Sequence, residues 1–282
     1  MAHGPLRPIR TVIDSNALQT PELRAYLARS SANFAVLNDY AAMEAYKENT
    51  LVSIFRSMDI LTNFPRQVIV LKTTGKICGL RGRANGLQRR MIDEKQTRWF
   101  PVFCRHLQAA QRGDAFIRGQ LLENGFVADE QMSKILADAL IIPAAINELR
   151  KAFTADELRV IRESQPFSST LVRKLLRFIT DLALITKDRH PNPPPPFRNE
   201  GELRNAFLFR FAVCSLVWSL DWIAQGGADN VRADRLRNDL VDVIFATYAT
   251  YFDDFLSRDK KALRVYARAK FIVAAISPAI NA

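Results

Sequence analysis

Arg10-Thr-Val-Ile-Asp14 is a short β-branched run that stops at an acidic residue. Because β-branched residues favour strands, this run predicts the first strand of a sheet. The segment Thr20-Pro21-Glu22 follows it and is typical of a helix start. Threonine is a good cap, proline suits the first turn, and the acid lies near the positive end of the helix. The beginning of the chain therefore has an α/β character.

Sequence patterns typical of strands and helices recur at two other places in the chain. Phe34–Leu37 and Gln67–Leu71 are short apolar runs that predict two more strands. Much further along, Ala233–Tyr251 has apolar residues at helical spacing and predicts a long helix. After this helix we expect a short strand over Asp254–Ser257 and a closing strand over Phe271–Ile276.

The middle of the chain has a different spacing of apolar residues. From about residue 84 to residue 225, apolar residues recur mainly at helical spacing. A proline-rich connector at 191–196 interrupts this pattern, because consecutive prolines exclude a helix or a central strand and favour polyproline II. The sequence therefore predicts a discontinuous α/β domain made of residues 1–75 and 230–282. A large all-helical insertion over 76–229 would interrupt it.

The composition of the chain is strongly basic. Its 282 residues include 40 Lys and Arg against 29 Asp and Glu, which gives a net charge of +11. A surplus of this size indicates a polyanionic partner, either nucleic acid or a membrane surface. The three cysteines are far apart and form no CxxC pair, which argues against a thiolate zinc site and a disulfide framework. We expect a cytoplasmic protein without a membrane partner, because the apolar segments are short for a membrane span.

Acidic residues stand at strand ends and helix starts of the α/β part. Asp14 ends the first strand, Glu44 lies on the helix after the second, and Asp259 follows the strand near residue 255. Asp239 and Asp242 share one face of the long helix that precedes that strand. In an open, mostly parallel sheet the site lies outside the carboxyl ends of the strands. These acids, although distant in sequence, are therefore expected to meet in one crevice.

A cluster of carboxylates favours a bound cation. Like charges ~4 Å apart repel by roughly 4 kcal/mol at an effective dielectric of 20, and a hard divalent cation removes that cost. Mg²⁺ held in this way can polarise a phosphodiester and activate a water molecule. Each acid also has a plainer explanation: Asp14 as a loop acid, Glu44 as a solvated helix residue, Asp239 or Asp242 as acids at a helix start, and Asp259 as the cap of the helix beginning at Lys260.

Four segments together resemble the successive signatures of PIN-domain ribonucleases. They are Val12-Ile-Asp-Ser-Asn16, Asn38-Asp-Tyr-Ala-Ala-Met-Glu44, Asn238-Asp-Leu-Val-Asp242 and Phe255-Leu-Ser-Arg-Asp259. The resemblance implies a PIN-like α/β fold, with a parallel sheet flanked by helices. The residues that it assigns to catalysis and to binding Mg²⁺ or Mn²⁺ are Asp14, Glu44, Asp239 or Asp242, and Asp259, with Asn16 and Ser257 as supporting polar groups.

The activity that this resemblance implies is that of a divalent-metal-dependent endoribonuclease, which leaves a 5′-phosphate and a 3′-hydroxyl. RNA, single-stranded or structured, is the expected partner, and an oligomer is left open. Many bacterial relatives are toxins, so a growth-inhibiting or defence role and an antitoxin or regulatory protein follow by analogy. Two alternatives belong to other classes: a non-catalytic RNA-binding PIN-like protein, and a helical interaction scaffold whose acids are coincidental.

A basic segment over Lys72–Arg98 follows the third expected strand. Its stretch 79–86 is punctuated by glycines and is typical of a mobile loop. Such a loop is well placed to bind a phosphate backbone, and an ordinary solvated basic surface is an equally weighted alternative. The candidate nucleic-acid-binding residues are Lys76, Arg81, Arg83, Arg89 and Arg90.

Overall fold

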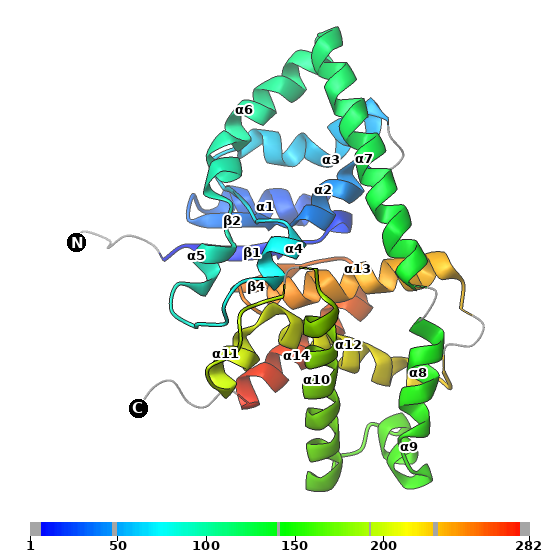
Figure 1. Ribbon diagram of the computed structural model, residues 1–282. Coiled ribbons are helices and arrows are strands. Elements are labelled where there is room, and N and C mark those ends of the chain that lie inside the picture. The colour runs from blue at the N-terminus through cyan, green and yellow to red at the C-terminus, as the bar shows by residue number, and fades with distance from the viewer. Residues whose placement is uncertain (1–6, 47–49, 140–141, 192, 228–230, 277–282) are drawn as a thin grey trace. The chain divides into compact units, whose positions relative to one another are not determined.

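The computed structural model describes residues 7–46, 50–139, 142–191, 193–227 and 231–276 (Figure 1). Internal contacts divide the chain into two compact units. The first, here called the sheet unit, consists of the described residues of 1–77, 86–133 and 248–263. The second, here called the helical unit, consists of those of 78–85, 134–247 and 264–282.

The bounds of these units differ from those of the domains expected from the sequence. The expected domains were residues 1–75 with 230–282, and residues 76–229. Residues 86–133 belong to the sheet unit, although they are helical, because α6 (Glu94–Gln111) packs against strand β3 (Val68–Val70). The Thr97 hydroxyl accepts a hydrogen bond from the Val70 amide at 3.0 Å. Residues 134–247 and 264–276 fall in the helical unit. The spacing of apolar residues along the sequence indicates secondary structure, whereas compact units depend on tertiary packing.

The sheet has four strands, all parallel, in the order β3-β2-β1-β4. β1 (Ile9–Ile13) lies in the centre between β2 (Asn33–Leu37) and β4 (Asp254–Leu256). Central strands of parallel sheets are covered on both faces, which agrees with the complete burial of Val12 and Ile13 in β1. The expected α/β class, with a parallel sheet flanked by helices, is confirmed.

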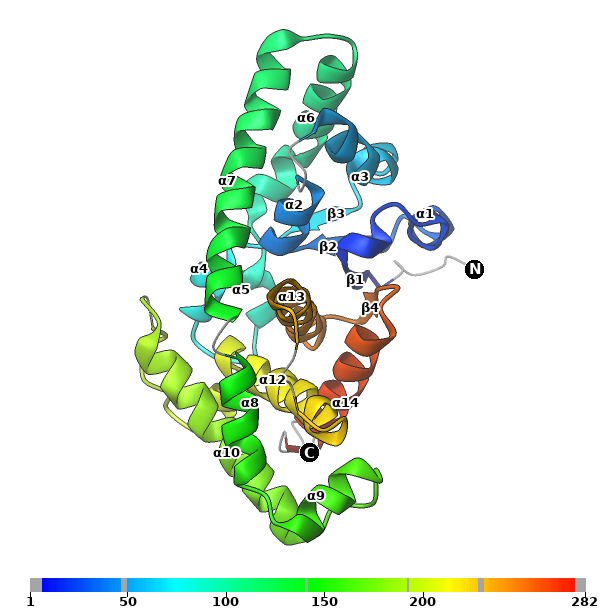
Figure 2. The same ribbon diagram turned by 90° about the vertical axis from the view of Figure 1, so that its right-hand side faces the viewer.

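The helices of the sheet unit begin where the sequence supplies a cap. The hydroxyl of Thr20 and the side-chain oxygen of Asn38 accept amide hydrogen bonds at the starts of α1 (Pro21–Arg29) and α2 (Asp39–Ala45). α1 packs against β2 (Figure 2). The other helices with residues in the sheet unit are η1 (Ser15–Ala17), α3 (Leu51–Asn63), α4 (Thr74–Cys78), α5 (Leu87–Met91) and α7 (Ala115–Ala139).

The expected closing strand over Phe271–Ile276 is wrong, because these residues end the long helix α14 (Lys260–Ile276). No proline or glycine interrupts the chain between its two ends. The buried side chains of α14 are Ala262, Val265, Tyr266, Ala269 and Val273. Their spacing of three and four residues is that of one helix face, whereas a half-buried strand would alternate. Short apolar runs do not distinguish the two structures by themselves.

The helical unit is built around α12 (Phe207–Ala224), which packs against α8, α9, α10 and α11. By length and composition α12 could cross a membrane, and 67% of its apolar window is buried inside the structure. A helix that is apolar on all sides and buried to this extent has the character of a core helix. The remaining helices are α8 (Ile142–Lys151), α9 (Ala155–Arg162), α10 (Ser169–Arg189), α11 (Glu200–Asn205) and α13 (Ala233–Ala249).

Candidate active site

Polar side chains gather where the parallel strands end. Asp14 follows β1 directly, Asp39 follows β2 after the capping residue Asn38, and Ser257 follows β4. Because β1, β2 and β4 are parallel, these ends lie at one edge of the sheet, here called the carboxyl edge. This is the edge at which open α/β sheets usually carry their sites.

Asp14 is the centre of a hydrogen-bonded cluster at this edge. Its side chain is buried, with only 1% of the residue exposed. The Oδ2 atom of Asp14 accepts hydrogen bonds from Asn16 Nδ2 at 2.6 Å and from Ser257 Oγ at 2.5 Å. The amide of Asp14 also donates to the Leu256 carbonyl at 3.0 Å. Two segments distant in sequence therefore hold this carboxylate in one orientation.

Glu44 joins the cluster through the hydroxyl of Ser15. Ser15 Oγ lies 3.3 Å from Asp14 Oδ1 and donates a hydrogen bond to Glu44 Oε2. One hydroxyl proton cannot be donated to two carboxylates at once, so the Asp14 and Glu44 carboxylates lack a compensating positive charge. Burial raises the pKa of Asp14 above its ordinary value, and the charge of Glu44 raises it further, while the Ser257 and Ser15 hydrogen bonds lower it.

Asp259 is tied to the same loops but has a structural task. Its Oδ1 atom accepts the amides of Lys261 at 2.5 Å and Ala262 at 3.0 Å, so it caps α14. Its own amide donates to Ser257 Oγ at 3.0 Å. The plainer explanation of Asp259 as a helix cap is therefore confirmed for one of its two oxygens. No bond to Oδ2 occurs among the residues that the structure describes.

Asp239 and Asp242 lie on α13 in the helical unit, whereas Asp14 lies in the sheet unit. Asp239 is 7% exposed, and its Oδ2 atom accepts hydrogen bonds from Trp218 Nε1 and Trp222 Nε1, both at 3.2 Å. The two indoles come from successive turns of α12. Asp239 thus ties α12 to α13, and Asp242 is half-buried on the same helix.

Asp39 is a polar residue of the carboxyl edge that the sequence analysis did not select. Its two carboxylate oxygens accept the Thr74 amide and the Thr74 hydroxyl, each at 2.7 Å. The Thr74 hydroxyl lies 2.8 Å from the Tyr248 hydroxyl. Burial raises the pKa of Asp39. Its position after β2, like that of Asp14 after β1, was the available signal.

The basic segment expected to bind nucleic acid is partly engaged within the protein. In the helical unit, a Cβ on Gly82 would lie 1.7 Å from the Glu202 carbonyl oxygen, so the backbone is closely packed there rather than free. Arg83 lies 3.6 Å from the Glu202 carboxylate, and Arg81 also has a partner. In the sheet unit, Arg89 pairs with Glu94 at 3.4 Å, Arg90 has a partner, and Lys76 is exposed.

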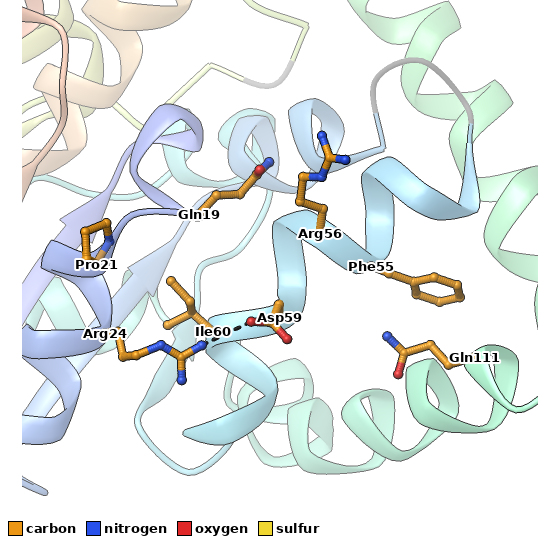
Figure 3. A pocket seen from close by; sticks show the side chains of 8 residues that line it. All are labelled: Gln19, Pro21, Arg24, Phe55, Arg56, Asp59, Ile60 and Gln111. Atoms are coloured by element: carbon orange, nitrogen blue, oxygen red, sulfur yellow. Dashed lines mark hydrogen bonds and ion pairs between the residues drawn. The ribbon is translucent and has the colours of Figure 1, made fainter.

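A shallow pocket of about 570 Å³ opens in the sheet unit beside the segment that follows η1 (Figure 3). Its lining comes from the segment after η1, from α1 and α3, and from the last residue of α6. The lining residues are Gln19, Pro21, Arg24, Phe55, Arg56, Asp59, Ile60 and Gln111.

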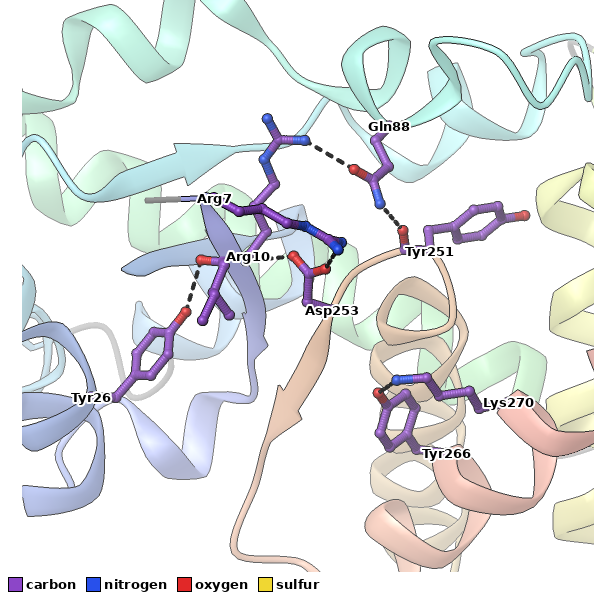
Figure 4. A network of polar contacts seen from close by, with 9 residues as sticks. Arg7, Arg10, Tyr26, Gln88, Tyr251, Asp253, Tyr266 and Lys270 are labelled. Carbon is purple, nitrogen blue, oxygen red and sulfur yellow. Dashed lines mark hydrogen bonds and ion pairs between the residues drawn. The ribbon is translucent and has the colours of Figure 1, made fainter. Parts of the chain in front are cut away.

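The opposite, amino edge of β1 and β4 carries charges that are paired with each other (Figure 4). Asp253 accepts the Arg10 amide at 2.9 Å and the Arg7 guanidinium at 2.9 Å. Arg10 also donates to Gln88 at 2.9 Å, and Gln88 donates to the Tyr251 carbonyl. This edge holds strands and α5 together, whereas the carboxyl edge brings two like charges together at Asp14 and Glu44.

Comparison with family models, with curated proteins and with solved structures gives no match for this chain. Within the part of the chain that the structure describes, no three Asp, Glu, His or Cys side chains form a group that could hold a metal ion. The two acids joined through Ser15 are therefore the strongest candidate ligands in the sheet unit.

Proposed function

We propose that this chain is a PIN-like, divalent-metal-dependent endoribonuclease whose site lies at the carboxyl edge of its sheet. The observation that carries the proposal is the buried Asp14 carboxylate beside Glu44, oriented by Asn16 and by Ser257. Such a pair destabilises the fold unless a positive charge or a proton joins it. The net charge of +11 supports a polyanionic substrate.

The donor set fits Mg²⁺ or Mn²⁺. Mg²⁺ is usually bound by one or two carboxylates and keeps several waters, so Asp14 and Glu44 suffice as protein ligands. The atoms that the described residues bring together here are carboxylate and hydroxyl oxygens, which suit hard cations. When bound, the cation would polarise the scissile phosphodiester and lower the pKa of a water molecule.

The protein's own groups have separate tasks in this proposal. Asp14 and Glu44 hold the cation, and Asn16 and Ser257 orient Asp14 by donating to its Oδ2 atom. Asp259 has Oδ2 available for a water or a cation while Oδ1 caps α14. On α13, the Oδ2 atom of Asp239 accepts two indole N–H groups, so this oxygen serves packing within the helical unit.

The test is Mn²⁺-dependent cleavage of single-stranded RNA by the unaltered protein, by Asp14→Asn and by Glu44→Gln. Each substitution removes one candidate ligand charge, so we expect losses of at least about 100-fold, beyond those typical of residues that only support ligands. The matched control is Glu22→Gln, an exposed acid in the first turn of α1, which should cleave normally. The products should carry a 5′-phosphate and a 3′-hydroxyl.

The alternatives give distinct outcomes in the same experiment. If all variants cleaved equally, the activity would come from elsewhere and the proposal would fail. RNA binding without metal-dependent cleavage by the unaltered protein would indicate a non-catalytic RNA-binding protein. The absence of both binding and cleavage would favour the helical interaction scaffold.

A further inference from the structure

The shallow pocket beside η1 carries an unbalanced positive charge. Arg24 is neutralised by Asp59 on α3, with the Arg24 Nη2 to Asp59 Oδ2 distance at 3.1 Å. Figure 3 shows this pair between α1 and α3. Arg56 lines the same pocket, is exposed, and has no hydrogen bond or ion pair among the described residues. The pocket is therefore suited to a group with one negative charge.

The same pocket holds an aromatic ring and two amides. Phe55 is half-buried, and its ring projects from α3 on the side of Gln111 (Figure 3). Gln19 donates through Nε2 to Ser57 Oγ at 3.3 Å, which orients its amide toward α3. An aromatic face binds a nucleobase by stacking, and amides can bind the polar edges of a base. Arg56 therefore suits a phosphate, and Phe55 with the two amides suits a base.

The position of the pocket connects it with the acidic cluster. η1 begins at Ser15, next to Asp14, and Gln19 lies in the second of two successive turns, in which Leu18 donates to Ser15 and Thr20 donates to Ala17. With a rise of about 2 Å per residue in such a turn, the backbones of Asp14 and Gln19 are on the order of 10 Å apart. Both belong to the sheet unit.

We propose that this pocket is a single-stranded RNA subsite, which takes up an unpaired base and its phosphate next to the scissile bond. The proposal rests on the proposed function for its orientation toward Asp14. Bases inside an A-form duplex are stacked on each other and cannot stack on Phe55, whereas unpaired bases can. The substrate class is therefore single-stranded RNA, or unpaired segments of a structured RNA.

The test measures binding apart from cleavage. A fluorescein-labelled single-stranded RNA of about 10 nucleotides is titrated against the Asp14→Asn protein in EDTA, and fluorescence anisotropy gives Kd. Phe55→Leu, which keeps an apolar side chain on α3, should raise Kd roughly fivefold or more, since stacking contributes about 1–3 kcal/mol per base. Arg56→Gln should raise Kd and reduce the log–log salt slope by ~0.7 for the lost phosphate contact.

The matched control is Arg66→Gln, an exposed arginine of the sheet unit outside the pocket, which should leave Kd unchanged. Duplex RNA of the same sequence should bind the Asp14→Asn parent and its Phe55→Leu variant equally. The proposal is overturned if both pocket variants bind the single strand as the parent does, or if the parent binds no RNA. Arg56 is exposed, so its variant keeps the test valid should Phe55→Leu fail to fold.

The two proposals fail separately. If the pocket variants lose binding but the unaltered protein cleaves no RNA with Mn²⁺, the pocket stands as a binding site for single-stranded RNA and the nuclease proposal falls. If the unaltered protein cleaves RNA and the pocket variants bind normally, the nuclease proposal stands and the subsite falls.

Discussion

Asp14 of the sheet unit and Asp239 of the helical unit are both buried acids, yet their surroundings differ in kind. Asp14 accepts hydrogen bonds from an amide and a hydroxyl, and a second carboxylate lies across Ser15. Asp239 accepts hydrogen bonds from two indoles and links two helices. A buried acid with neutral donors contributes to packing, whereas one beside another acid is short of positive charge. Burial alone therefore does not identify a functional acid.

The largest expected effect separates Asp14 from Asp239. Asp14→Asn should lower Mn²⁺-dependent RNA cleavage by at least about 100-fold, as expected when a ligand rather than a supporting group is removed. Asp239→Asn should cleave like the unaltered protein, because the asparagine carbonyl oxygen still accepts the indole N–H groups. Initial cleavage rates at saturating Mn²⁺ measure both. Equal cleavage by the two variants would break the comparison.

The next effect concerns the stability of the helical unit. Asp239→Ala leaves buried indole N–H groups of Trp218 and Trp222 without this acceptor, so the free energy of unfolding should fall by about 1–3 kcal/mol. Urea unfolding followed by tryptophan fluorescence measures the loss. Asp156→Ala is the control, because its ion pair with Arg159 is exposed and contributes little. Equal stability of Asp239→Ala and Asp156→Ala would show that the indole contacts are dispensable.

The smallest expected effect is a pH-dependent gain in stability on removing the charge of Asp14. Burial raises the pKa of Asp14 in the folded state above 3.8, so the ionised form destabilises the metal-free protein at neutral pH. Asp14→Asn should therefore melt at a higher temperature there. An amide at this position can donate to Ser15 Oγ while its oxygen still accepts from Asn16 and Ser257.

Thermal melts in EDTA between about pH 8 and pH 4 measure this gain, and it should shrink as the pH falls and protonates Asp14 in the folded protein. About 2–4 °C accompany each kcal/mol in a protein of this size. A gain that stayed constant with pH would mean that Asp14 carries no unfavourable charge, and the contrast with Asp239 would disappear.

The sequence alone was sufficient to predict the parts of the sheet that depend on local pattern. Short β-branched and apolar runs marked all four strands, and the acids or hydroxyls after them marked the carboxyl edge. The resemblance to PIN-domain ribonucleases also grouped Asp14, Asn16 and Ser257 in one prediction, and the structure places them in contact. Parallel strands make this possible, because whatever follows each of them lies at the same edge.

Other features depend on tertiary contacts and were not predictable in this way. The indoles that bind Asp239 lie on another helix, and no spacing rule links them to it. The helix at 260–276 was mistaken for a closing strand in its last turns, because a short apolar run fits both structures. Asp39 was not selected, since an acid at a helix start has an ordinary explanation until Thr74 and Tyr248 are seen beside it.

The order of the strands also has a consequence for synthesis of the protein on the ribosome. β1 lies between β2 and β4, although β4 comes near the other end of the described chain. At about 5–20 residues per second, Asp14 is made on the order of ten seconds or more before Ser257. Until then one side of β1 lacks its neighbour, and Asp14 lacks the hydroxyl that orients it. Translation that stops early therefore releases a chain whose acidic cluster is incomplete.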